Sequence, residues 1–182
     1  MKRTVELAAA PTGMQPGGYV PKAYAGRGQP FTPSATIEAV HGAGGWRIQL
    51  SWACPEPVRD IRNESDLFVD AAALAAPTAD DAPWVTMGAP GRAIEGVLWR
   101  ANESALRSFH AEGLGSVKRS AAPGGWMVTA DWAKDTWQLA FELPSWPQLD
   151  ARPRLAFAIW RGAARDRGGL KSISPGWIEL LP

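Results

Sequence analysis

The stretch WRIQLSW, residues 46–52, decides the fold class of this chain. Its apolar residues occupy alternate positions, namely Trp46, Ile48, Leu50 and Trp52, and polar residues fill the positions between them. Because successive side chains of a β-strand point to opposite faces, this pattern predicts a strand with one buried face. The same alternation recurs in TWQLAFEL at 136–143 and in RLAFAIW at 154–160.

Further strands are expected where apolar segments lie between clusters of Gly, Pro, Asp and Asn. These segments are Thr36–Val40, Asp66–Leu74, Ala93–Trp99, Gly125–Asp131 and Trp177–Leu181. A helical turn is expected only at Glu103–His110, with Asn102 as its N-cap. Many strands with little helix indicate a sandwich or a closed barrel. We therefore predict an all-β fold, an antiparallel β-sandwich with a few short helical turns.

The beginning of the chain has a different composition from the rest. Five prolines and several glycines fall within residues 8–35, which predicts an irregular Pro/Gly-rich arm over 1–35. The β-sandwich domain is then expected to span 36–182. A length of 182 residues fits one such domain with a full hydrophobic core.

The charge and the cysteine content exclude several classes of function. A net charge of +1 argues against nucleic acid as a partner. The single cysteine, Cys54, excludes an internal disulfide framework and a zinc site built on paired cysteines. No apolar run approaches the roughly 20 residues of a membrane span. The segment MKRTVELAAAP at 1–11 contains an apolar run that is too short for a signal peptide. We therefore expect a cytoplasmic chain, a chain whose signal peptide has been removed, or export together with a partner.

Catalytic motifs are weak in this sequence, so we expect no catalytic residue. The two histidines, His41 and His110, accompany no Gly-x-Ser-x-Gly elbow. Two residues do stand out, because Met87 precedes the turn Gly-Ala-Pro-Gly and Lys171 follows Gly-Gly-Leu. The simplest interpretation is that the methionine fills a gap in the core and the lysine is an exposed cation. The ten tryptophans could equally fill a core, line a sugar site or enclose a flat cofactor.

Three segments together resemble a known family. They are DLFVDAAALAAP at 66–77, VTMGAPGRAIEGVLWRA at 85–101 and LAFAIWRGAARDRGGLKSISPGWIEL at 155–180. In this order they are similar to the haem b (gamma) subunits of the type II dimethyl sulfoxide reductase family, which serve ethylbenzene dehydrogenase, chlorate reductase, selenate reductase and dimethylsulfide dehydrogenase. The resemblance runs from about Thr36 to Leu181.

The resemblance implies a β-sandwich that holds one haem b through a methionine and a lysine. By position these axial ligands are Met87 and Lys171, which would explain why a methionine stands in a rigid turn. The haem is expected between two splayed sheets, among tryptophan side chains. The expected wall residues are Trp99, Trp126, Trp137 and Trp160. The arginines expected to pair with the haem propionates are Arg47, Arg92, Arg161, Arg165 and Arg167.

The family also implies a function and partners. With both axial positions of the iron filled, the haem would carry single electrons and leave catalysis to another subunit. The implied partners are a molybdenum catalytic subunit, an iron-sulfur subunit and an external carrier such as a cytochrome c, in the periplasm. Two other functions stay open, a carbohydrate-binding β-sandwich with exposed tryptophans as sugar platforms and, less well supported, a stand-alone hydrolase.

Overall fold

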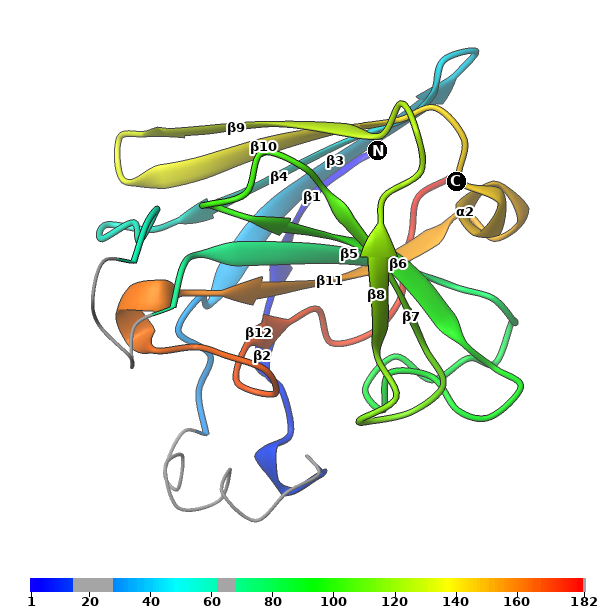
Figure 1. The fold of residues 1–182 in the computed structure, drawn as a ribbon, viewed down its shortest axis with the longest axis horizontal. Coiled ribbons are helices and arrows are strands. Elements are labelled where there is room, and N and C mark those ends of the chain that lie inside the picture. The colour runs from blue at the N-terminus through cyan, green and yellow to red at the C-terminus, as the bar shows by residue number, and fades with distance from the viewer. Residues whose placement is uncertain (15–27, 62–67, 182) are drawn as a thin grey trace.

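The computed structural model describes residues 1–14, 28–61 and 68–181, and it confirms the predicted all-β fold. Every strand pairing in it is antiparallel, and the strands form two sheets (Figure 1). The smaller sheet has the order β1-β3-β4-β10-β9. Its strands are β1 (Lys2–Glu6), β3 (Ser34–Gly42), β4 (Gly45–Ala53), β10 (Thr136–Leu143) and β9 (Met127–Ala133).

The larger sheet has the order β2-β12-β11-β5-β6-β7-β8, and β13 pairs with β11 beside this path. Its central strands are β11 (Arg154–Trp160), β5 (Ala71–Pro77), β6 (Ile94–Arg100) and β7 (Arg107–Ala111). Its shorter strands are β2 (Ala8–Ala9), β12 (Ser172–Ile173), β8 (Lys118–Ala121) and β13 (Ile178–Glu179). The described helices are the short α2 (Pro147–Ala151) and the 3-10 turns η1 (Thr12–Met14) and η2 (Gly162–Ala164).

The main core lies between the two sheets, and the alternation in the sequence accounts for it. In β4 the four alternate apolar residues are buried, and in β10 the apolar residues opposite them are buried too. From the larger sheet, Trp99 packs against this layer, with its ring centroid 5.0 Å from Trp137 and 6.2 Å from Trp52. The predicted buried faces of 46–52, 136–143 and 154–160 are thus confirmed.

A second apolar layer covers the other face of the larger sheet. Strand β5 is buried at every position, because Ala72 and Leu74 face the smaller sheet while Ala73 and Ala75 face outward beneath loops. These loops connect β5 to β6, β7 to β8, and β11 to β12. Because loops cover the outer face of the larger sheet, a buried site can form there, on the side away from the smaller sheet.

Two sequence-based expectations differ from the structure. Residues Arg107–Ala111 form strand β7 and not part of a helical turn, because Phe109 and Ala111 alternate with more exposed residues and pair with β6. The beginning of the expected arm is ordered in both sheets, since β1 pairs with β3 and β2 pairs with β12. The remainder of that arm falls partly on 15–27, outside the described residues.

Membrane-spanning helices were not expected from the sequence. In the described ranges, no helix has the length and the apolar composition needed to cross a lipid bilayer.

Candidate cofactor site

A cavity of about 520 Å³ lies on the outer face of the larger sheet. Its floor consists of small side chains, Ala71 and Ala73 of β5 and Ala158 of β11. The register places Ala73 beside Ala158 on one side and Leu98 on the other, so these residues form one row across three strands. Because alanine side chains scarcely rise above a sheet, this row leaves room for a ligand against the backbone. The volume falls within the roughly 300–1,000 Å³ typical of ligand and cofactor sites.

One wall of the cavity is the turn that carries Met87, between β5 and β6. The Met87 backbone has φ = 60°, a left-handed conformation that a non-glycine residue adopts at a cost of about 1–2 kcal/mol. The turn is closed by two hydrogen bonds, from the Met87 N–H to the Trp84 carbonyl at 2.9 Å and from the Gly88 N–H to the Pro83 carbonyl at 2.8 Å. A strained backbone at a residue without an evident structural need is a typical mark of a functional position.

Gly88 also accounts for the shape of this turn. Its φ of 82° is unfavourable for any side chain, and a Cβ there would lie 2.7 Å from the carbonyl oxygen of Ala111. The Met87 carbonyl in turn accepts a hydrogen bond of 2.9 Å from the Gly113 N–H. The Met87 turn therefore packs directly on the chain that follows β7, which fixes the height of the methionine above the sheet.

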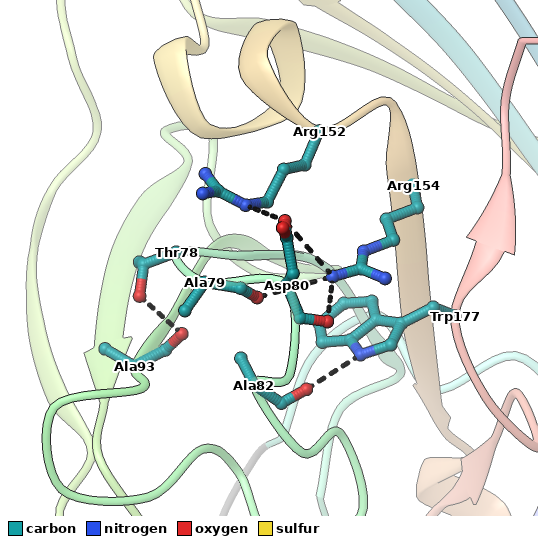
Figure 2. A network of polar contacts seen from close by, with 8 residues as sticks. All are labelled: Thr78, Ala79, Asp80, Ala82, Ala93, Arg152, Arg154 and Trp177. Atoms are coloured by element: carbon teal, nitrogen blue, oxygen red, sulfur yellow. Dashed lines mark hydrogen bonds and ion pairs between the residues drawn. The ribbon is translucent and has the colours of Figure 1, made fainter.

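A polar network anchors the chain that leads into the Met87 turn (Figure 2). Arg152 directly follows α2 and Arg154 begins β11, and the two side chains converge on Asp80. The Arg154 guanidinium donates to the backbone carbonyls of Ala79 and Asp80, and Arg152 Nε donates to the Asp80 carboxylate at 2.6 Å. Because charged donors form the stronger hydrogen bonds, these contacts fix this chain segment to the start of β11.

Two indole N–H groups tie the same segment to the end of the chain. Trp177 Nε1 donates to the Ala82 carbonyl at 2.9 Å, and Trp84 Nε1 donates to the Ser174 carbonyl at 2.9 Å. The two rings lie 5.8 Å apart between centroids. Segment 79–84 is therefore held on both sides before it reaches Met87.

The opposite wall is the loop between β11 and β12, which ends at Lys171. Trp160 closes the loop by donating its Nε1–H to the Gly168 carbonyl at 3.0 Å. The Asp166 carboxylate accepts from the Arg161 N–H at 3.1 Å. At the far end, the Lys171 carbonyl accepts from the Ala10 N–H at 3.0 Å, next to the β2–β12 pairing.

A buried carboxylate fixes the beginning of this loop. Asp70 has no exposed surface and accepts hydrogen bonds from three N–H groups, those of Val58 at 2.9 Å, Gly162 at 2.8 Å and the Trp137 indole at 2.9 Å. A buried charge needs such partners to offset its desolvation. Asp70 thus connects the inter-sheet core, through Trp137, to the loop that carries Lys171.

Met87 and Lys171 meet inside the cavity. Lys171 Nζ lies 3.9 Å from Met87 Sδ and 5.1 Å from the centroid of the Trp160 ring. Within the described part of the chain, no carboxylate forms an ion pair with Lys171. Its ammonium therefore lies beside a thioether and an indole face.

This environment changes the protonation of Lys171. Burial, and to a smaller extent the positive charge of Arg119, lower the pKa of Lys171 from 10.5 to about 8. At pH 7, deprotonating an amine with a pKa of 10.5 costs about 5 kcal/mol, and deprotonating one with a pKa of 8 costs only about 1 kcal/mol. A neutral amine and a thioether are both ligands for transition metals. The pair can therefore bind a metal centre from two sides.

Of the site residues predicted from the sequence, the structure brings together Met87, Lys171 and Trp160, and it separates Trp99 from them. Trp99 is directed between the sheets, because alternate residues of β6 face opposite ways and Leu98 is the neighbour that lines the cavity. Trp126 and Trp137 also pack on the inter-sheet core. The expectation of a site between two splayed sheets is thus corrected: the cavity lies outside the sandwich, under loops.

The five arginines expected to pair with the haem propionates do not gather at the cavity. Of the five, only Arg167 lines the cavity, while Arg47 pairs with Glu142 and Arg92 pairs with Asp81 elsewhere. Arg161 donates to the Phe31 carbonyl. The structure adds two arginines that the sequence analysis missed, Arg100 at the end of β6 and Arg119 on β8. Their position follows only from strand register, which places Arg119 beside Phe109.

Histidine, cysteine and acidic residues do not form a metal site in the described ranges, since no group of three or more of them converges. Cys54 is buried, and its thiol contacts the Asp70 carboxylate at 3.5 Å. Burial and the adjacent Asp70 charge raise the pKa of Cys54 to about 12, so this thiol is neutral at physiological pH.

Comparison with characterised sequences gives three relatives, although no family model matches the chain. The chain is 26% identical over 151 residues to dimethylsulfide dehydrogenase subunit gamma of Rhodovulum sulfidophilum, and 24% identical over 163 residues to chlorate reductase subunit gamma of Ideonella dechloratans. It is 30% identical over 176 residues to a Haloferax mediterranei protein provisionally named as a respiratory nitrate reductase haem subunit.

These alignments cover most of this chain and a smaller part of each relative. They include 72%, 84% and 87% of the chain, in the order Rhodovulum, Ideonella and Haloferax, and 54%, 66% and 62% of the respective relatives. The chain thus spans less than two thirds of the length of the curated relatives it matches. The first two are gamma subunits of enzymes that the sequence resemblance had indicated, so that resemblance is confirmed.

Proposed function

We propose, from this similarity to gamma and haem subunits of the type II dimethyl sulfoxide reductase family, that the chain is the electron-transfer subunit of a molybdenum oxidoreductase complex. It would carry one haem b with Met87 and Lys171 as the axial ligands. The single observation that supports this most strongly is the approach of Met87 Sδ to Lys171 Nζ within one cavity.

The residues present fit a haem in three respects. The cavity floor is apolar and made of small side chains, which suits a flat ring. Met87 Sδ and Lys171 Nζ lie 3.9 Å apart, so two atoms that can ligate a transition metal stand at one place in the cavity. The lowered pKa of Lys171 makes its neutral amine accessible near pH 7.

The chain's own residues would determine what the cofactor can do. A haem held there supplies a one-electron couple, whose potential thioether ligation raises relative to two nitrogen ligands. Met87 and Lys171 would fill both axial positions and so exclude substrate from the metal. Trp84 and Trp160 would exclude water from two sides of the cavity. Such a site favours electron transfer and assigns catalysis to another subunit.

The proposed partners follow from the names of the relatives and the resemblance. They are a molybdenum catalytic subunit, an iron-sulfur subunit that exchanges electrons with this chain, and an external carrier such as a cytochrome c. The proposed location is the periplasm, and the cytoplasm is the alternative. Subcellular fractionation of cells that express the native complex, followed by immunodetection of this chain, distinguishes the two compartments.

The alternative function, a carbohydrate-binding module, lacks a supporting observation. Such a module needs exposed tryptophans as platforms, yet none of the ten tryptophans of this chain is exposed, and all ten fall within the described residues. Four retain partial exposure, namely Trp126, Trp132, Trp160 and Trp177. The stand-alone hydrolase lacks support too, because the described lining of the cavity contains no serine, cysteine or histidine.

The test is reconstitution of the full chain with haem b, followed by optical and electron paramagnetic resonance spectroscopy. We expect a low-spin six-coordinate spectrum that changes in Met87→Ala and in Lys171→Ala. The matched controls are Met127→Ala, whose side chain is exposed on β9, and Lys2→Ala on the edge strand β1. An unaltered spectrum in both cavity variants would refute the ligand assignment, and absence of haem uptake by the wild type would refute the cofactor.

A further inference from the structure

Basic side chains outnumber acidic ones in the lining of the cavity. Four of the lining residues are basic, Lys171, Arg100, Arg119 and Arg167, and one is acidic. The acidic residue, Asp166, is buried, and its carboxylate accepts the Arg161 N–H. Among the described lining residues, the cavity therefore has an excess of positive charge facing an apolar floor.

The cations are spread over separate elements. Arg100 ends β6, Arg119 lies in β8, and Arg167 belongs to the loop before Lys171. The Arg167 guanidinium lies 5.0 Å from the centroid of the Phe68 ring, a cation–π arrangement that fixes its direction. Three arginines from separate elements thus line one cavity.

Arg119 differs from the other two arginines. Arg100 forms an ion pair with Glu103, whereas Arg119 forms none with any residue that the structure describes. Without an acidic partner among the described residues, the Arg119 guanidinium can pair with an anionic group of the ligand.

Guanidinium groups favour one type of anion. The planar fork of arginine matches a carboxylate with two parallel hydrogen bonds, which a compact ammonium cannot form. We infer that Arg119, flanked by Arg100 and Arg167, binds the carboxylates of the ligand in this cavity, so that the ligand's apolar edge rests on the alanine floor and its acidic edge faces outward. The inference rests on the proposed function and adds the determinant of ligand orientation.

The inference can be tested with porphyrins that differ only in their carboxylates. Iron-free protoporphyrin IX and its dimethyl ester are titrated into the full chain, and binding is followed by quenching of tryptophan fluorescence, to which Trp84 and Trp160 at the cavity contribute. We expect the free acid to bind at least about tenfold more tightly than the ester, since a charged donor strengthens each hydrogen bond. In Arg119→Gln the preference should fall severalfold, and in the triple variant Arg100→Gln/Arg119→Gln/Arg167→Gln it should vanish.

The matched control changes the net charge equally without touching the cavity. It is Arg47→Gln/Arg92→Gln/Arg107→Gln, three exposed arginines that pair with acidic side chains elsewhere. This triple variant should retain the full preference. Equal binding of acid and ester by the wild type, failure of the wild type to bind either, or a preserved preference in the triple cavity variant would overturn the inference.

Failure of this inference is distinguishable from failure of the proposed function. The porphyrin titration contains no iron, so it does not depend on Met87 or Lys171 as ligands. If haem is bound in the six-coordinate form but the free acid is not preferred over the ester, only the carboxylate-binding role of the three arginines is overturned. An acid preference together with a spectrum insensitive to Met87→Ala and Lys171→Ala would overturn the axial ligands alone.

Discussion

Met87 Sδ and Lys171 Nζ lie 3.9 Å apart, although 84 positions separate the two residues in the sequence. One belongs to the turn between β5 and β6, and the other ends the loop between β11 and β12. The two loops meet because β5 and β11 are neighbours in the larger sheet. Their encounter is therefore a consequence of strand order, and each loop has its own anchors to hold its residue in place.

The ligand-free chain should become more stable as the pH rises from 8 to 10.5. The pKa of Lys171 is about 8 in the folded state and 10.5 as an ordinary lysine, so in this window the unfolded chain holds the proton that the folded chain has released. Stability increases with pH wherever the unfolded state binds more protons. Urea unfolding at pH 7 and pH 10 should show that Lys171 contributes about 2 kcal/mol to the difference.

The matched variant for this measurement is Lys171→Met, which keeps the length of the side chain and removes the charge. It should lack the Lys171 contribution and be more stable than the wild type at pH 7. Lys2→Met, at an exposed position, should behave as the wild type does. An identical pH response in Lys171→Met and the wild type would show that this amine is not desolvated in the folded chain.

Cys54 should resist thiol reagents in the folded protein. With a pKa of about 12, caused by burial and by the adjacent Asp70, only roughly one thiol in ten thousand is ionised at pH 8. Dithionitrobenzoate should therefore react with the chain only after addition of denaturant. Rapid labelling of the native protein at pH 8 would contradict both the burial and the raised pKa.

Removal of the Asp70 carboxylate should destabilise the fold strongly. In Asp70→Ala the N–H groups of Val58 and Gly162 and the Trp137 indole N–H lose their acceptor in the interior, at a combined cost of about 3–5 kcal/mol. Asp70→Asn keeps one acceptor oxygen and should lose less. Equilibrium unfolding in urea measures both variants, and Asp131→Ala on the exposed strand β9 is the control. A loss below about 1 kcal/mol in Asp70→Ala would show that these donors find other partners.

Arg154 and Arg152 should differ in their contribution to stability. The Arg154 side chain is mostly buried and donates to two backbone carbonyls, whereas the Asp80 carboxylate bound by Arg152 is 86% exposed. Arg154→Ala should therefore cost about 1–3 kcal/mol, and Arg152→Ala less than about 1 kcal/mol. Hydrogen exchange of the Met87 and Gly88 amides, which are bonded to Trp84 and Pro83, should accelerate in Arg154→Ala only. Equal effects of the two variants would show that Arg154 does not anchor this turn.

The alternation of apolar residues was enough to predict the two-sheet fold, because β4, β10 and β11 each have one face in the inter-sheet core. It was not enough for Arg107–Ala111, where a short strand with one polar and one mixed face has no clear period. The beginning of the chain was also misjudged. Strand β1 is an edge strand with only Val5 buried, so its sequence shows little of the pairing that its backbone makes.

The position of the cavity could not be predicted, for a related reason. Strand β5 is apolar on both faces, so its sequence does not indicate which face a ligand would occupy. Trp99 was expected as one of the tryptophans around a site between the sheets, while the register of β6 places Leu98 and Arg100 at the cavity instead. Met87 and Lys171 were predicted by resemblance to a family, and their role as ligands stays a prediction.

The two-sided burial of the larger sheet has a consequence for how a ligand could enter or leave. Amide protons of β5 and β11 should exchange with solvent only when the whole domain unfolds, since those strands are central and covered on both faces. The Met87 turn and the Lys171 loop are each connected to that sheet by a few polar contacts. They can therefore open locally at a fraction of the free energy of global unfolding. Binding and release of a prosthetic group would then require only a local opening of these two loops, while strands β5 and β11 beneath them stay folded.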